Sequence, residues 1–167
     1  MAMEELELES SAPILLTQAG HDRLRAELNH LTVEKRKEIA ERIRESKDHG
    51  EFSEDNNELD EIKMEQAIVE SRIGELKTIL SGAAILTLAD ISTDEVGLGS
   101  VATVADAARG IESDHRIVAS IEANADEDLI SEESPLGEAL LGKKVGENAT
   151  FDAPVGRLTY KVKNISA

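Results

Sequence analysis

Residues 59–80 read LDEIKMEQAIVESRIGELKTIL. Seven of these residues, almost all apolar, recur at alternating steps of three and four and form what we call the seam. The seam consists of Leu59, Ile62, Gln66, Val69, Ile73, Leu76 and Leu80, of which only Gln66 is polar. Such alternation is the heptad pattern of a coiled coil, in which a narrow stripe of each helix packs against a partner helix. The stretch therefore predicts one long helix with a second helix beside it.

The chain upstream of this stretch supplies the second helix. No proline interrupts the chain from Thr17, whose hydroxyl is a suitable N-cap, to about Lys47. The apolar stripe of this segment is Leu24, Leu28, Leu31, Ile39 and Ile43, with one phase slip after Leu31. At 1.5 Å per residue, about 30 helical residues reach roughly 45 Å.

A break at residues 48–50 and a new helical run from near Asp55 join the two helices. We therefore predict an antiparallel coiled-coil hairpin over residues 14–82, with an acidic tip at 48–55. Residues 1–13, which are acidic before a short apolar stretch, are expected to form a flexible tail.

The pattern changes after the hairpin to short apolar runs separated by Gly and Pro turns. The strand candidates are 85–88, 100–104, 116–121, Phe151 and 158–162. Pro135 opens a short helical stretch, Leu136–Leu141, that Gly142 closes. Residues 83–167 are thus expected to form a mixed domain with an antiparallel sheet, which makes the whole chain α+β.

The composition narrows the class of function. The chain has 35 acidic and 18 basic residues and therefore a net charge of −17. This negative charge disfavours direct binding to a nucleic-acid backbone. Only three aromatic residues are present, too few for a base-stacking platform, and cysteine is absent. No apolar run is long enough to cross a membrane. A cytoplasmic protein with a basic protein partner or a cation is expected.

The densest acidic cluster lies at the predicted tip. Asp48, Glu51, Glu54 and Asp55 fall within eight residues, more carboxylates than the nearby lysines can pair. Mg²⁺ usually accepts one or two protein carboxylates together with another molecule's oxygens. The tip is therefore a candidate to hold a metal at another protein's active site. A solvated loop whose acids favour the start of the second helix is the alternative. Since the sequence contains no complete active site, an autonomous enzyme is not expected.

Four stretches, taken together, resemble the GreA/GreB transcript cleavage factors of bacteria over about residues 14–167. They are LTQAGHDRLRAELNHL (16–31), HGEFSEDNNELDE (49–61), EQAIVESRIGELKTIL (65–80) and ISEESPLGEALLGKKVGENATFDAPVGRLTYKVKNI (130–165). The resemblance implies a coiled-coil hairpin followed by an FKBP-like domain that docks on RNA polymerase. The hairpin then enters the polymerase's secondary channel, where the polymerase cleaves its own backtracked transcript. The resemblance thus implies a factor that is not itself an enzyme, and we expect it to be a monomer.

The resemblance also assigns site residues by position. Glu51 and Glu54 match the two tip acids that help hold the second Mg²⁺ of the polymerase. Glu51 stands where the family has Asp, and counting back from Glu65 gives one extra residue, which places Asp55 rather than Glu54 at the second acid. The positions that match polymerase-binding residues are Lys47, Glu133, Ser134 and Pro135.

Three other interpretations remain open from the sequence. The altered tip favours a Gre-like channel protein that inhibits the polymerase without supporting cleavage. A peptidyl-prolyl isomerase or peptide-binding chaperone would need an aromatic-lined pocket, and residues 81–167 offer only Phe151 and Tyr160. A plain coiled-coil adaptor is the third.

Overall fold

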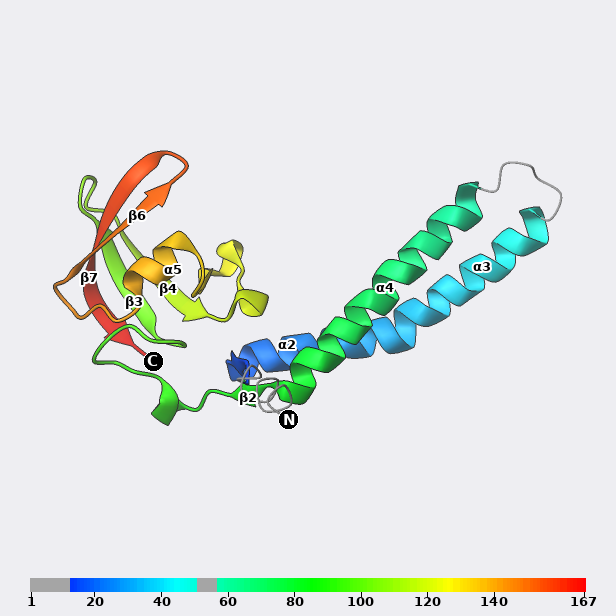
Figure 1. Ribbon diagram of the computed structural model, residues 1–167, viewed down its shortest axis with the longest axis horizontal. Helices are drawn as coiled ribbons and strands as arrows, with labels where there is room; N and C mark the ends of the chain where they lie inside the picture. Colours follow the sequence, from blue (N-terminus) through cyan, green and yellow to red (C-terminus); the bar gives the residue numbers. More distant parts are fainter. Residues whose placement is uncertain (1–12, 51–56) are drawn as a thin grey trace, which may run out of the picture. The chain divides into compact units, whose positions relative to one another are not determined.

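The computed structural model describes residues 13–50 and 57–167, and the chain divides into two compact units (Figure 1). The hairpin unit is His21–Gly82. The C-terminal unit joins residues 13–20 to Ala83–Ala167. The fold is α+β, as the sequence predicts.

The hairpin unit consists of two helical arms packed along one apolar stripe. The first arm is made of α2 (Gln18–Asn29), η1 (His30–Lys35) and α3 (Arg36–Gly50), and the second arm is α4 (Asn57–Gly82). The core between them holds Ile39, Ile62, Val69 and Ile73, with Leu28, Leu31 and Ile43 packed against it. The two predicted stripes therefore do face each other.

The phase slip in the first arm has a structural cause. Residues 30–35 form a π-helical segment, η1, between the two α-helices. A π-turn holds more residues than an α-turn, so it takes up one extra residue without turning the following side chains away. The Thr32 hydroxyl donates to the Leu28 carbonyl at 2.8 Å, a side-chain bond of the kind that bends helices. Leu31 and Ile39 consequently pack in the same core.

Two details of the hairpin prediction are wrong. The expected break at 48–50 is part of α3, which runs to Gly50, because a single glycine costs a helix only about 1 kcal/mol. Gln66 lies on the predicted seam but is exposed, whereas Val69 is buried. Burying an amide without a hydrogen-bond partner is unfavourable, so Gln66 stays in water.

The C-terminal unit is built on a five-stranded sheet in the order β5-β4-β3-β7-β6. The strands are β3 (Val101–Asp106), β4 (Glu112–Val118), β5 (Leu129–Ser131), β6 (Asn148–Ala153) and β7 (Gly156–Ser166). All neighbours are antiparallel except β4 and β5, which run parallel. The helix α5 (Pro135–Leu140) contributes Leu140 to the core formed with Val104, Ile117 and Val162. Short 3-10 turns, η2 (Leu88–Asp90), η3 (Ser120–Glu122) and η4 (Ala125–Glu127), connect these elements.

Two strand boundaries differ from those predicted. The expected strand 85–88 is reduced to β2 (Ala84–Ile85), which pairs in parallel with β1 (Leu15–Leu16). Asp90 accepts hydrogen bonds from the Thr87 backbone N–H at 2.9 Å and hydroxyl at 2.8 Å, and this capping box turns the chain into η2. The expected strand 116–121 begins earlier, at Glu112, and ends at Val118, where the chain enters η3.

A buried carboxylate fixes the first turn of α2 within the C-terminal unit. Thr17 caps α2, its hydroxyl accepting the Gly20 N–H at 3.0 Å, which confirms the predicted N-cap. Glu122, only 3% exposed, accepts the Thr17 N–H at 2.9 Å and the Thr17 hydroxyl at 2.5 Å. Gly20 faces this carboxylate so closely that a Cβ there would lie 1.7 Å from its Oε1.

Candidate functional site

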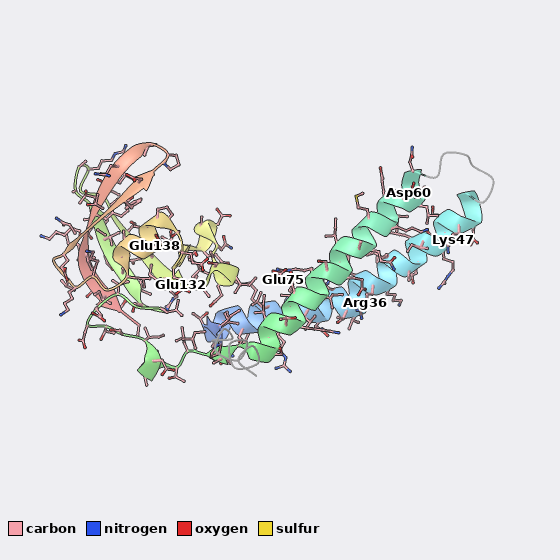
Figure 2. All side chains as sticks on the ribbon, in the orientation of Figure 1. Arg36, Lys47, Asp60, Glu75, Glu132 and Glu138 are labelled. Carbon is pink, nitrogen blue, oxygen red and sulfur yellow. The ribbon has the colours of Figure 1, made fainter. Side chains whose placement is uncertain are left out.

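The predicted tip acids Glu51, Glu54 and Asp55 lie outside the described residues. The structure describes the helix ends on either side of them. Lys47 and Asp48 are exposed near the end of α3, and Asp60 is exposed in the first turn of α4 (Figure 2). Glu58 and Asp60 in that first turn match the positive end of the helix dipole, as the solvated-loop alternative expects.

Farther along the hairpin, basic side chains pair across the two arms. Arg42 donates to Glu65 at 2.7 Å, and Lys35 lies 3.1 Å from the same carboxylate. The hydrogen bond from Arg42 holds the pKa of Glu65 below its ordinary value. Arg36 pairs with Glu70 through two hydrogen bonds, of 2.8 and 2.9 Å.

Near the tip this compensation ends. Within residues 13–50 and 57–167, the exposed acids Asp60 and Glu61 make no ion pair, and neither does Lys47. Lys35, Arg36 and Arg42 are thus offset by acids of α4, while the start of α4 keeps unpaired carboxylates. This gives the tip end of the hairpin a negative charge before the three undescribed acids are added.

The predicted docking residues Glu133, Ser134 and Pro135 lie together at the start of α5. Ser134 caps α5, accepting the Gly137 N–H at 3.0 Å, and donates to the Ser131 carbonyl at 2.7 Å. Glu133 accepts from the Ser120 hydroxyl at 2.9 Å and remains exposed, as does Pro135. Ser134 therefore shapes the corner, while the side chains of Glu133 and Pro135 are exposed to solvent. Lys47 belongs to the other unit.

The corner opens onto a shallow groove of about 480 Å³ between α5 and β6. Its lining residues are Glu133, Pro135, Glu138, Ala139, Thr150, Phe151 and Asp152. Three of them are acids, and Glu138 lies on α5 (Figure 2). Phe151 packs edge-on against Tyr160, with ring centroids 5.2 Å apart. Sequence reasoning missed Glu138 and Asp152, because only the packing of α5 against β6 brings Asp152 beside the acids at the start of α5.

Neither a metal site nor a membrane helix is present in the parts of the chain that the structure describes. No three histidine, aspartate or glutamate side chains within 13–50 and 57–167 gather closely enough to hold a metal ion. None of the described helices is both long enough and apolar enough to span a bilayer.

Family models match nearly the whole chain. Residues 14–85 match "Transcription elongation factor, N-terminal", and residues 91–167 match "Transcription elongation factor, GreA/GreB, C-term". The chain belongs to the GreA/GreB family. The two matched segments meet close to the end of α4, so each GreA/GreB module corresponds to a distinct part of the fold.

Individual GreA/GreB proteins are similar over almost their full length. The transcription elongation factor GreA of Caldanaerobacter subterraneus subsp. tengcongensis is 42% identical over 155 residues, covering 93% of this chain and 98% of that relative. GreA of Chloroflexus aggregans is 46% identical over 153 residues, covering 92% of this chain and 97% of that relative. The solved structure of GreA factor homolog 1 (Gfh1) of Thermus thermophilus is 34% identical, with a TM-score of 0.43 and coverage of 93% and 100%.

Proposed function

We propose that this chain is a cytoplasmic transcription elongation factor that binds RNA polymerase as a monomer and stimulates cleavage of backtracked RNA. In this proposal the hairpin enters the secondary channel and delivers its tip carboxylates to the polymerase active site. The observation that carries the proposal is the charge pattern of the hairpin. Lys35, Arg36 and Arg42 pair with acids of α4 in the middle of the arms, whereas Asp60 and Glu61 beside the tip make no ion pair among the described residues.

The tip residues supply the chemistry that such a role needs. Glu51, with Glu54 or Asp55, would offer the hard oxygen ligands that Mg²⁺ prefers. When bound, Mg²⁺ supplies charge stabilisation and an activated water for phosphodiester hydrolysis. The chain's own residues hold and orient carboxylates, and the polymerase provides the remaining ligands and the RNA. The factor is thus a source of ligands and not an enzyme by itself.

In the C-terminal unit, we assign docking to the exposed side chains at the start of α5. Glu133 and Pro135 are exposed there, and Ser134 holds the turn in shape through its two hydrogen bonds. The three acids of the adjoining groove favour a basic partner surface. The chain's excess of acids agrees with a factor that contacts protein rather than nucleic acid.

A second candidate function is inhibition of the polymerase without cleavage. It is favoured by the sequence at the tip, where Glu51 has a side chain one methylene longer than Asp and one extra residue alters the spacing. Reactions that depend on positioned groups lose about 100-fold in rate for a misplacement of roughly 1 Å. The same bound geometry would then block the channel without completing the metal site.

Transcript cleavage in backtracked elongation complexes distinguishes the two functions. The proposal predicts that the wild-type chain accelerates 3′ cleavage and that Glu51→Ala abolishes the acceleration. Of Glu54→Ala and Asp55→Ala, the one that also abolishes it identifies the second metal ligand. Glu41→Ala, an exposed acid of α3 away from the tip, is the matched control and should leave the rate unchanged. RNA synthesis slowed by the wild-type chain, without cleavage, would instead establish the inhibitor.

A further inference from the structure

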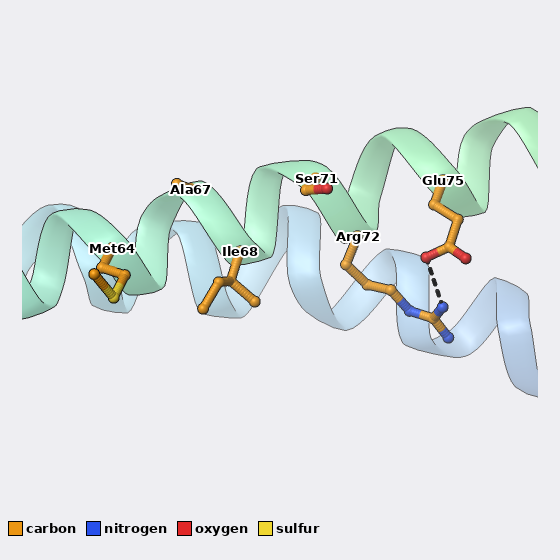
Figure 3. A pocket seen from close by; sticks show the side chains of 6 residues that line it. All are labelled: Met64, Ala67, Ile68, Ser71, Arg72 and Glu75. Carbon is orange, nitrogen blue, oxygen red and sulfur yellow. Dashed lines mark hydrogen bonds and ion pairs between the residues drawn. The ribbon is translucent and has the colours of Figure 1, made fainter.

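Helix α4 carries a second apolar face in addition to the seam that packs on α3. Met64, Ala67, Ile68 and Ser71 follow the spacing i, i+3, i+4, i+7, which places them on one side of a helix. Figure 3 shows these four side chains along the same stretch of α4. We call them the outer stripe. Met64 is 68% exposed and Ile68 is 64% exposed, whereas the seam residue Val69 is buried.

The outer stripe lines an open groove of about 450 Å³ that ends at Arg72 and Glu75. Arg72 donates to Glu75 at 2.9 Å (Figure 3) and to both oxygens of Glu27 at 2.7 and 3.0 Å. These hydrogen bonds raise the pKa of Arg72 above its ordinary value, so its charge is permanent and is offset by two carboxylates. The groove is therefore apolar along its length and electrically compensated at this end.

The outer stripe is not needed for the hairpin core. The core between the arms is made by other residues of α4, namely Ile62, Val69 and Ile73. Single exposed apolar residues are ordinary, but contiguous apolar surface on a monomer commonly marks a binding site. Because Met64 and Ile68 are mostly in water, replacing them with small polar residues should leave folding intact.

We propose that the outer stripe is a contact surface for RNA polymerase and receives an apolar side chain flanked by Lys or Arg. This inference rests on the proposed function and adds to it a binding surface away from the tip. The charges at the other end of the stripe favour that chemistry, since the exposed acids Asp60 and Glu61 outnumber Lys63. A partner with basic residues beside its apolar side chain would complement both features.

The size of the stripe argues against a second copy of this chain as the occupant. From Met64 to Ser71 the helix rises only roughly 10 Å. A stable interface buries about 800 Å² on each partner, which is more than four side chains on one helix turn or two can provide. The stripe is thus suited to support a contact that is anchored elsewhere, as the docking corner of the C-terminal unit would do.

The test uses the full chain carrying Met64→Ser and Ile68→Ser together. Titration of the fluorescently labelled chain with core RNA polymerase from the source organism measures Kd. We expect a Kd about tenfold higher than that of the wild type, with an unchanged circular dichroism spectrum and thermal midpoint. Val33→Ser is the matched control, because Val33 is 60% exposed and lies in η1 of the other arm. Its Kd should equal that of the wild type.

Each other outcome overturns the inference in a distinguishable way. If the wild type binds the polymerase and the double variant binds equally well, the outer stripe is not a contact while the proposed function stands. If the wild type does not bind at all, the proposed function fails and the inference fails with it. If Val33→Ser raises the Kd for the polymerase as much as the double variant does, the loss of binding is not specific to the outer stripe. Self-association that the double variant abolishes, measured by sedimentation, would identify a second copy as the occupant.

Discussion

The carboxylate of Glu122 accepts hydrogen bonds from both the backbone N–H and the hydroxyl of Thr17, a residue 105 positions away in the chain. Local sequence rules identify Thr17 as an N-cap because its hydroxyl and the Gly20 N–H are three residues apart. The same local rules do not predict the contact with Glu122, because Glu122 meets Thr17 only in the folded chain. At this scale, local bonds are predictable and long-range bonds are not.

Gly20→Ala should destabilise the protein. A Cβ at Gly20 would displace the Glu122 carboxylate and break its bonds to Thr17, and a lost hydrogen bond to a charged group costs about 1.5–3 kcal/mol. Gly74→Ala is the control, since a Cβ there meets nothing within 4 Å in the interior of α4. The free energy of unfolding of Gly74→Ala should instead rise by about 0.5–1 kcal/mol, because alanine favours a helix more than glycine does. Urea unfolding measures both, and a Gly20→Ala variant as stable as the wild type would contradict the close approach.

His115 should make stability depend on pH. Burial lowers the pKa of this ring, against the opposing effect of Asp128 and Asp114. Among the described residues its Nδ1 has no hydrogen-bond partner, and Asp128 Oδ1 is 4.0 Å away. Because the unfolded chain, with a histidine pKa of about 6.5, binds a proton more readily, stability is full above that pH and declines as pH falls through the lower folded pKa.

The measurement is the difference in unfolding free energy between pH 7 and pH 5. His115→Gln should lose less stability over this interval than the wild type does. Gln66→Ala, at an exposed position of α4 that does not titrate, is the control and should show the pH dependence of the wild type. Identical pH dependence in the His115 variant and the wild type would show that this ring does not couple to folding.

At the scale of elements, the periodicity of apolar residues predicted the hairpin, because one stripe on each arm is sufficient to define two packed helices. The short strands were harder to predict. β2 is confined to Ala84–Ile85 by the capping box of η2, and β5 pairs with β4 in parallel through only three residue pairs. Such short segments carry no periodicity of their own, and tertiary pairing determines where they begin and end.

The π-helical segment leads to a prediction about chain length. Leu31 and Ile39 are eight residues apart instead of the heptad's seven, and η1 takes up the difference. Deleting the exposed Val33 should convert η1 to a regular α-helix, restore the heptad and leave stability within about 1 kcal/mol of the wild type. Helical circular dichroism and urea unfolding measure the outcome.

Deletion of Ala40 is the matched control for the Val33 deletion. Ala40 is also exposed, but it lies in α3 beyond η1, so its removal turns Ile43 away from the core. Exposing a buried aliphatic side chain costs about 1.5–3 kcal/mol, and this variant should be the less stable one. Equal destabilisation by the two deletions would show that η1 does not absorb the extra residue.

At the scale of the whole molecule, each unit has its own hydrophobic core and its own predicted contact residues. The family and the α+β class were predictable because both units carry long, specific sequence stretches. The groove at α5 was not predictable, because only the packing of α5 against β6 brings Asp152 beside Glu133 and Glu138. The tip acids Glu51, Glu54 and Asp55 were assigned from the resemblance.

The central claim is that the tip carboxylates help hold Mg²⁺ for cleavage by RNA polymerase. The most direct measurement is a Mg²⁺ titration of 3′ cleavage in backtracked complexes, with no factor, the wild-type chain, or a variant carrying Glu51→Ala, Glu54→Ala and Asp55→Ala. The wild type should lower the Mg²⁺ concentration that gives half-maximal cleavage, and the triple variant should bind the polymerase yet return this concentration to the factor-free value. An unchanged Mg²⁺ requirement with the wild-type chain would contradict the claim.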